Sequence, residues 1–540
     1  MNYRIVLRYL GIIAFLLGAS MAASLPWGLM VPENDMPHEY RGMIGLSLSI
    51  LSCFLTGAIL VRIGRNAGSQ FFRKEAMAVV SLSWVLATFL GGLPYLFSLV
   101  HRDTGVPMNY ADALFEAQSG FSTTGSSVFS ELEDPAQLPR CILFWRATTH
   151  YLGGLGIMVL FVAILGSSNS NAGKVFVRLE TTGKGIGPQT PVRRIAFTLF
   201  AIYTGLCAIL ATILFCLGLS AFDAICHSFS VVATGGFSNF NASAGYFATH
   251  GYRFAAMIEW VLILFMFIAS CNFILLFQVI KGLPGKLFAD VEWKTFCMIV
   301  VIASTVVFLG GMFNGDFDAF GTADCPIAGV AIDPETGNGT SPPSIALRQT
   351  IFQVVSIIST TGLCTDDYEE WNPLSYGIIL MLMFVGGCAG STAGGMKVIR
   401  FVFGWKILRM EGERSFRPNV VRPLIINGRA MEREAIHNVL VYFLTILFIA
   451  MSSMLLLVAI EPIATWDARD AGKRLSDSIS AVASTLNNVG PGFGVIGAKG
   501  NYGGFSDVSK LLFVWLMMLG RLEIFVVLSL FHPSFWKKLG

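Results

Sequence analysis

The sequence has few charged residues, few histidines and no closely spaced cysteine pairs, and each lack excludes a class of protein. Only 13% of its 540 residues are charged while 54% are hydrophobic, which is far from the composition of a soluble domain. The ten cysteines include no CxxC spacing and the seven histidines include no HExxH pair, so we expect neither a disulfide framework nor a metal centre. A net charge of +3 gives no reason to expect nucleic-acid binding.

Motifs for nucleotides and for catalysis are lacking as well. The glycine-rich stretch from Gly183 to Gly187 matches neither GxxxxGK[ST] nor GxGxxG, so we expect no organic cofactor in this chain. An intramembrane enzyme would need a paired set such as two mid-span aspartates or a Ser/His pair, and none is visible. We therefore expect a protein that is not an enzyme.

Long apolar runs are what the chain has instead. About ten of them contain 18 or more mostly apolar residues, enough to cross a roughly 30 Å hydrocarbon core. They lie near 9–30, 43–63, 77–98, 141–165, 195–219, 254–280, 296–313, 374–390, 438–460 and 509–531. The first run follows Arg4 and Arg8 as a signal peptide would, but it lacks a small-residue cleavage site and is expected to remain as an anchor. These runs predict an all-α polytopic membrane protein.

Basic residues alternate with acidic ones in the connections between these runs. Lys and Arg gather at 4–8, 62–74, 174–194, 281–294, 400–433 and 537–538, which predicts that these connections and both termini are cytoplasmic. The opposite connections are rich in Asp and Glu. The outer face should therefore attract cations, although solvated acidic loops are the alternative interpretation.

Four short segments, each ending at a glycine, recur between the apolar runs. They are Ser122-Thr123-Thr124-Gly125, Val232-Ala233-Thr234-Gly235, Ser359-Thr360-Thr361-Gly362 and Asn487-Asn488-Val489-Gly490. Each follows a stretch of about a dozen residues that is too short to cross a membrane: 110–121, 222–232, 345–358 and 475–486. The predicted repeat is a span, a re-entrant half-helix, a turn and a second span. Because each repeat has an even number of crossings, all four run parallel and can surround one pore.

The turns have the chemistry of an ion filter. Irregular backbone at membrane depth is tolerated only where it is buried or lines a water-filled cavity. Glycine permits positive φ, so neighbouring carbonyls can face one axis and replace the water around a dehydrated K⁺, and each half-helix aims its negative end at the centre. One Thr-Gly pair is an ordinary turn, but four copies predict a filter. Its candidate ion-binding residues are Thr123, Thr124, Gly125, Ala233, Thr234, Gly235, Thr360, Thr361, Gly362, Asn488, Val489 and Gly490.

The run from Gly386 to Gly395 has five glycines in ten positions inside an apolar span. Glycine in a helix interior costs about 1 kcal/mol relative to alanine, so the helix should break there. Close packing of two helices through small residues is the alternative.

Arg521 is predicted near the middle of the last span, where a charge costs about 2.5–3.5 kcal/mol on insertion scales. It needs a partner inside the protein, and Glu523 is two residues on and faces another side of the helix. Carbonyls freed by the broken helix at 386–395 are better candidates. A structural arginine that ties two helices together remains the alternative.

The turns, the run from Asn487 to Gly494 and the run from Gly386 to Lys397 resemble the Trk/Ktr/HKT superfamily of potassium transporters, closest to the bacterial TrkH type. The resemblance covers nearly the whole chain, and the two leading spans favour TrkH over Ktr. It implies an intramembrane gating loop beneath the filter that obstructs the closed pore. The gating residues would be Gly386, Gly387, Gly390, Ser391, Thr392, Gly394, Gly395, Lys397 and Arg521.

The same resemblance implies potassium uptake, with K⁺ as the transported and bound ion, in the bacterial cytoplasmic (inner) membrane. It also implies a homodimer and a cytosolic ring of nucleotide-binding, TrkA-like regulator subunits, which would meet the basic stretches 174–194 and 400–433. In the plant relatives a serine in the first filter position goes with Na⁺ transport, so Gly125 favours K⁺. A Na⁺-permeable transporter, or one that couples K⁺ to Na⁺ or H⁺, remains the alternative.

The expected organisation is two peripheral helices followed by four pore repeats. The predicted divisions are 1–70 for the two leading helices, 71–180 for repeat 1, 181–285 for repeat 2, 286–410 for repeat 3 with the loop 386–395, and 411–540 for repeat 4.

Overall fold

The computed structural model describes residues 1–32, 35–65, 73–154, 192–314, 331–332, 339–340, 343–418, 423–427, 429–431, 433–466, 471–522 and 524–536. Several features of the sequence lie outside these residues. They are the Gly183 to Gly187 stretch, the basic stretch 174–191, the second half of the run 141–165, most of 315–342, and Glu523.

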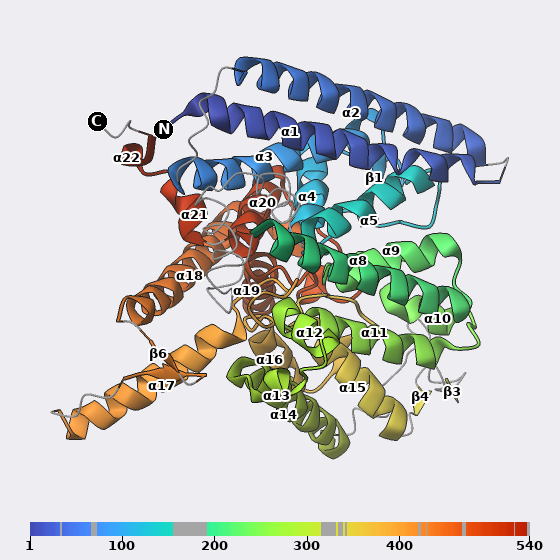
Figure 1. Cartoon of the computed structure of the whole chain (residues 1–540). Coiled ribbons are helices and arrows are strands. Elements are labelled where there is room, and N and C mark those ends of the chain that lie inside the picture. Colours follow the sequence, from blue (N-terminus) through green and yellow to red (C-terminus); the bar gives the residue numbers. More distant parts are fainter. Residues whose placement is uncertain are drawn as a thin grey trace.

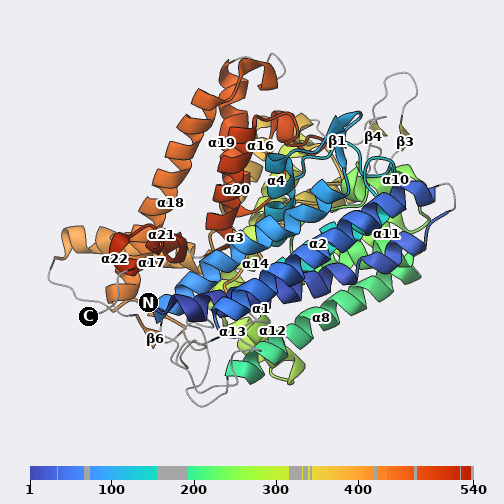
Figure 2. The same cartoon turned by 90° about the horizontal axis from the view of Figure 1, so that it is seen from above.

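Two leading helices, α1 (Tyr3–Ala22) and α2 (Met36–Ile63), lie side by side at one edge of the molecule (Figures 1 and 2). They run antiparallel, because Gly11 on α1 lies against Gly57 and Val61 on α2 while Gly18 lies against Cys53. A Cβ on Gly11 would approach the Gly57 carbonyl oxygen to 2.8 Å, so glycine permits the close approach. A third helix, α3 (Arg73–Phe97), packs against both.

Most of the other described helices form four copies of one unit: a helix, a short pore helix and a second helix. The units are α3, α4 (Tyr110–Phe121) and α5 (Arg140–Gly154); α8 (Val192–Cys216), α9 (Ala221–Val232) and α11 (Ala255–Ala269); α14 (Val291–Asn314), α15 (Pro343–Ile358) and α16 (Pro373–Leu382); and α18 (Arg433–Ile460), α19 (Ala471–Asn487) and α20 (Asp507–Arg521). The expected all-α fold with four repeats is confirmed.

Three of the predicted spans are broken helices. The run 254–280 is two helices, α11 and α12 (Phe273–Ile280), bent by 105°. The run 374–390 is helical only to Leu382, and the run 509–531 is divided between α20 and α21 (Ile524–Ser529). Among the described residues, six helices are long and apolar enough to span a membrane, or seven if the bent pair counts as one span. The sequence predicts about ten spans, and one of them, 141–165, is described only as far as Gly154. Within the described residues, irregular backbone interrupts three of the predicted spans, including the one in which the sequence predicts a break.

The remaining elements are short or peripheral. They are α10 (Tyr246–Thr249), α13 (Gly285–Ala289), α17 (Val398–Phe416) and α22 (Pro533–Trp536), with antiparallel pairs β1–β2 (His101–Asp103, Val106–Pro107), β3–β4 (Ala331–Ile332, Gly339–Thr340) and β5–β6 (Ile425–Ile426, Arg429–Ala430). Helix α17 projects from the body of the molecule in both views (Figures 1 and 2).

The buried core has two halves. One joins the leading helices to repeats 1 and 4, and the other joins repeats 2 and 3. The turns that follow the pore helices meet between the two halves, as the contacts described next establish.

Candidate functional site

All four pore helices end in the same backbone structure. One or two residues after the end of each helix stands a left-handed residue, with φ between 52° and 55°: Thr123, Thr234, Thr360 and Asn488. The next amide donates back to a serine carbonyl in the last turn of the helix, at 2.9 Å for Thr124 to Ser119, 2.8 Å for Gly235 to Ser230, 2.9 Å for Thr361 to Ser356 and 2.9 Å for Val489 to Ser484. This is a Schellman motif, which ends a helix and turns the chain sharply.

In the second turn, the left-handed glycine lies one residue later than the predicted segment Val232 to Gly235 places it. The glycines with positive φ are Gly125 (82°), Gly236 (82°), Gly362 (76°) and Gly490 (107°). Gly236 therefore matches Gly125, and Gly235 stands where the other segments have Thr or Val. The alignment through Gly235 is out of register because two consecutive glycines follow Thr234, and the sequence does not say which one takes the left-handed conformation.

The four glycines close a ring. A Cβ on Gly125 would collide with the carbonyl oxygen of Gly235, one on Gly236 with that of Thr361, one on Gly362 with that of Val489, and one on Gly490 with that of Thr124. Each segment thus contacts the next, and the fourth returns to the first. Only glycine fits, because any side chain would lie against a neighbouring carbonyl.

The carbonyl oxygens of this ring belong to Thr124, Gly235, Thr361 and Val489, all of which are buried. Within the described part of the chain, none of the four oxygens accepts a hydrogen bond. Buried carbonyls without a partner are rare, and a ring of them can replace the hydration shell of K⁺. The described residues contain no group of three or more His, Cys, Asp or Glu side chains that could hold a metal ion, so backbone oxygens are the available ligands.

Most threonine hydroxyls of the turns are used within the protein. The Thr124 hydroxyl shares a 2.7 Å hydrogen bond with Ser122, and Thr361 does the same with Ser359. The Thr234 hydroxyl donates to the carbonyl of its own neighbour at 2.6 Å. These side chains brace the turns, which leaves the carbonyls as the oxygens that can face an ion.

The fourth segment is held from outside the ring by a tyrosine. Tyr502 donates its hydroxyl to the carbonyl of Gly490 at 3.1 Å, and Ser126 donates to the same oxygen at 3.0 Å. The Gly490 oxygen is therefore engaged by the protein, although its residue was expected among the ion ligands. Behind Tyr502, the Gly503 carbonyl accepts a 2.9 Å hydrogen bond from the Lys510 ammonium.

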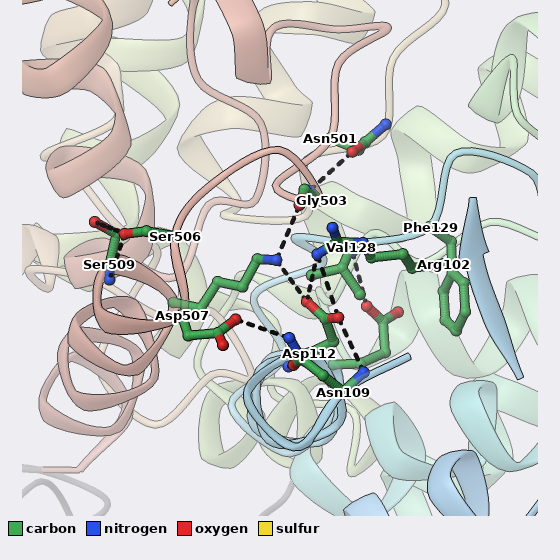
Figure 3. A network of polar contacts seen from close by, with 12 residues as sticks. Arg102, Asn109, Asp112, Val128, Phe129, Asn501, Gly503, Ser506, Asp507 and Ser509 are labelled. Atoms are coloured by element: carbon green, nitrogen blue, oxygen red, sulfur yellow. Dashed lines mark hydrogen bonds and ion pairs between the residues drawn. The ribbon is translucent and has the colours of Figure 1, made fainter. Parts of the chain in front are cut away.

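A buried ionic network ties the first pore helix to the last helix of repeat 4 (Figure 3). Lys510 on α20 donates to Asp112 at 2.5 Å, and both side chains have 0% exposure. Asp112 also caps α4 with Asn109, whose side chain reaches Asp507 at 2.8 Å. Arg102 approaches the same carboxylate at 3.4 Å. Sequence reasoning missed Lys510, whose long-range partner is 398 residues away.

The glycine-rich segment from Gly386 to Lys397 forms a loop against the side of the ring where the pore helices end. Gly394 donates its amide to the Thr360 hydroxyl at 2.7 Å, and a Cβ on Gly394 would approach that of Asn488 to 2.7 Å. Thr392 donates its hydroxyl to the carbonyl of Val232, at the end of pore helix α9, at 2.9 Å. The loop thus contacts the ends of three of the four pore helices.

The break between α11 and α12 holds this loop. Ser270 accepts a 2.9 Å hydrogen bond from the Cys388 amide, and Asn272 donates to the Ala389 carbonyl at 2.5 Å. Glu292 on α14 is fully buried and accepts from the Ala389 amide at 2.7 Å. The bend in one helix therefore supplies the polar partners that a non-helical segment needs at membrane depth.

Arg521 lies between this loop and α5. Its guanidinium donates to the carbonyl of Thr392 at 2.6 Å and to the carbonyls of Gly153 and Gly154, each at 2.6 Å. The structure thus brings Arg521 to the broken segment, as the sequence predicts, and adds the end of α5 as a second partner. Lys397 donates to the carbonyl of Ala393 within the loop.

One carboxyl in the connection between the third pore helix and α16 has an unusual proton affinity. Asp366 lies between Gly362 and α16, and burial raises its pKa to about 7, although the Trp371 indole donates to it at 3.3 Å. Its backbone carbonyl accepts a 3.2 Å hydrogen bond from Gln353 on the third pore helix.

The chain is similar to known proteins over its whole length. A family model described as TrkH, cation transport protein, matches residues 49–538. The Trk system potassium uptake protein TrkH of Salmonella typhimurium is 31% identical over the full length of both chains, and that of Escherichia coli is 30% identical, also over both full lengths. The crystal structure of the potassium transporter TrkH from Vibrio parahaemolyticus matches with a TM-score of 0.81 and 29% identity, over 99% of this chain and 100% of that one.

Proposed function

Because the chain belongs to the TrkH family of cation transport proteins, we propose that it takes up K⁺ across a membrane through the ring of four carbonyls. It is a membrane transporter and not an enzyme. The observation that carries this function is the closed ring at Thr124, Gly235, Thr361 and Val489, whose buried oxygens accept no hydrogen bond within the described residues. Oxygens in this arrangement suit a dehydrated K⁺.

The ion-binding segments in this proposal are the four turns in their structural register. They are Thr123 to Gly125, Thr234 to Gly236, Thr360 to Gly362 and Asn488 to Gly490. With Gly236 as the ring glycine of repeat 2, glycine stands at all four ring positions. This supports K⁺ over Na⁺ as the preferred ion.

Beneath the ring, the loop from Gly386 to Lys397 acts as the gate. Its contacts with Thr360 and Asn488 support a position that closes the ion path. Arg521 holds the loop in this state, and its positive charge repels K⁺. Opening requires the loop to leave both the ring and Arg521.

The protein lies in a bacterial inner membrane with both termini in the cytoplasm and the filter open to the outer face. The alternation of basic and acidic connections supports this orientation. The inside-negative potential drives uptake with about 2.3 kcal/mol per charge per 100 mV. Repeats 1 to 4 occupy 71–180, 181–285, 286–410 and 411–540, and 1–70 forms the peripheral helices.

Two partners complete the proposal: a second copy of the chain and a cytosolic TrkA-like regulator ring. Helix α17 is where the regulator would bind, since it projects from the body of the molecule (Figure 1) and exposes Arg409, Arg414 and Arg417. Movement of α17 could reach the gate directly because the helix follows Lys397 without a linker.

Rubidium uptake into cells that lack their own K⁺ transport tests the function. Expression of the chain should restore uptake of ⁸⁶Rb⁺, and a regulator subunit should change its rate. An excess of unlabelled K⁺ should compete with the tracer much better than the same excess of Na⁺. Uptake no higher than in cells with an empty vector would contradict the proposal, and equal competition by Na⁺ would favour a Na⁺-permeable transporter.

A further inference from the structure

His150 lies on α5 directly behind the second filter segment. A Cβ on Gly235 would meet the His150 ring first, with Cε1 at 2.5 Å and Cγ at 2.6 Å. At the matching position the other three segments carry side chains, those of Thr124, Thr361 and Val489. In repeat 2 the imidazole therefore fills the space that a side chain of the filter segment itself would otherwise take.

The His150 ring is fixed by packing. It is fully buried and stacks on Phe237, with the ring centroids 4.0 Å apart and the planes 12° from parallel. The guanidinium of Arg146 lies 3.4 Å from the centroid of Phe237, and it is held by Glu116 at 2.6 Å and by the Ser238 carbonyl at 2.8 Å. Within the described residues, neither nitrogen of the His150 ring makes a hydrogen bond. The imidazole therefore contacts the filter segment through its shape and not through hydrogen bonds. Its stacking partner Phe237 is held in place by Arg146, which belongs to a buried ion pair.

Repeat 2 also lacks the brace that repeats 1 and 3 have. In those repeats a serine and a threonine two residues apart share a 2.7 Å hydrogen bond, as Ser122 and Thr124 do. The matching residues of repeat 2 are Ala233 and Gly235, which have no hydroxyl. The second segment therefore has no side-chain brace of its own at these positions.

We propose that His150 is the positioning residue for the second filter segment, and that its ring sets how far the Gly235 carbonyl extends toward the ion. The proposal rests on the ring of carbonyls being the K⁺ filter. In this proposal, ion selectivity at the Gly235 position, one of the four in the carbonyl ring, depends on α5. Because Gly153 and Gly154 on the same helix bind Arg521, α5 also links the filter to the residue that holds the gate.

The test is a double-mutant cycle in proteoliposomes, with ⁸⁶Rb⁺ and ²²Na⁺ uptake measured separately. His150→Ala removes the ring, so the Gly235 segment can retreat, and the Rb⁺/Na⁺ uptake ratio should fall about tenfold. Gly235→Ala places a Cβ against the His150 imidazole and displaces the segment, so it should also lower the Rb⁺/Na⁺ uptake ratio, by about tenfold. The double variant H150A/G235A refills the space and should recover the ratio to within about threefold, because residues in contact are not additive.

Two further variants separate positioning from general stability. His150→Phe keeps a flat ring stacked on Phe237 and should hold the ratio within about threefold of the unmodified protein. His227→Ala removes a buried histidine of pore helix α9 in repeat 2, one whose ring bonds the Asp223 carbonyl, and should neither change the ratio nor couple to Gly235→Ala. If His150→Ala does not elute as a folded protein, His150→Val takes its place in the cycle, because it still removes most of the imidazole volume next to Gly235 but leaves a smaller cavity.

The proposal is overturned if the two single effects add in the double variant, if folded His150→Ala keeps the ratio, or if His150→Phe behaves like His150→Ala. Failure of the proposed function has a different signature, because the unmodified protein would then take up no ⁸⁶Rb⁺. Uptake by the unmodified protein together with an additive cycle would reject only the part assigned to His150.

Discussion

The carbonyl ring is built from the same local structure four times, whereas in the part of the chain that the structure describes the loop against it occurs in repeat 3 only. Each ring segment ends a pore helix with a left-handed residue and a glycine two residues later. The loop from Gly386 to Lys397 instead interrupts one helix with five glycines and returns on itself, with Gly386 donating its amide to the Met396 carbonyl at 2.8 Å. A symmetric ring needs four copies, whereas the proposed gate needs only one obstruction to close one pore.

The two regions are also held by different forces. Buried ion pairs brace the outer side of the pore helices, including Arg146 with Glu116 and Arg348 with Glu259, and breaking such a pair costs about 3–5 kcal/mol. The loop is held mainly by hydrogen bonds to backbone groups, each of which contributes about 1 kcal/mol net, or roughly 1.5–3 kcal/mol where Arg521 is the donor. The loop should therefore open at a free-energy cost that leaves the ring intact.

The largest effect should come from a methyl group added to the ring itself. Gly236→Ala places a Cβ against the Thr361 carbonyl at a residue with φ of 82°, so we expect ⁸⁶Rb⁺ uptake to fall at least about 100-fold. Gly205→Ala on α8 is the matched control, because a Cβ there has nothing within 4 Å. If Gly236→Ala takes up ⁸⁶Rb⁺ at more than a tenth of the unmodified level, Gly236 is not a ring glycine, and Gly235 is the glycine that matches Gly125.

Shortening the loop should have the opposite sign. Deletion of Gly390 to Gly394 removes the contacts with Thr360 and Asn488, so basal ⁸⁶Rb⁺ uptake without a regulator should rise about tenfold. Elution of the variant as a monodisperse peak on size exclusion provides the control for folding. A well-folded deletion variant with no uptake would show that the loop supports the pore and does not obstruct it.

Removing the charge that holds the loop should give a smaller increase. Arg521→Gln loses the positive charge and most of its bonds to the Thr392, Gly153 and Gly154 carbonyls, and basal uptake should rise about threefold to tenfold. Arg521→Lys keeps the charge but has one donor group, so its basal uptake should lie between those of Arg521→Gln and the unmodified protein. If Gln and Lys variants both match the unmodified protein while remaining folded, Arg521 is a structural tie between helices and not part of the gate.

The local features of the ring are predictable from the sequence. The first pore helix, Tyr110–Phe121, has the predicted bounds, and the second begins one residue before the predicted start at Phe222. These boundaries follow from short-range signals: a capping residue at the start and a left-handed residue with glycine at the end. The register of the second turn escaped prediction because either Gly235 or Gly236 could satisfy the same local signal.

Features that depend on distant contacts could not be predicted. Lys510 sits in an apolar helix, and only the folded chain brings Asp112 to it. His150 is an isolated histidine in the sequence, and its contact with Gly235 joins residues of two repeats. The break after Ser270 looks like continuous helix in the sequence, because the residues that it bonds lie far along the chain, such as Ala389, which is 117 residues from Asn272. Contacts of this kind are properties of packing, not of local pattern.

The smallest predicted effect concerns the outer side of the ring, and it tests whether that region is as fixed as its buried charges suggest. Burial raises the pKa of Asp366 to about 7, far above its value of about 3.9 in an unfolded chain. The folded protein therefore prefers the protonated carboxyl, whose stabilising contribution is complete below pH 4 and is lost as the pH rises through 7.

Asp366→Asn keeps a neutral group of the same shape at every pH. Between pH 5 and pH 8, the melting temperature of this variant should fall about 2 °C less than that of the unmodified protein. Asp103→Asn is the matched control, because a hydrogen bond from Ser130 lowers the pKa of Asp103 and its titration lies below this window. Equal changes in melting temperature for Asp366→Asn and the unmodified protein would mean that Asp366 is ionised throughout, and that this outer connection admits water.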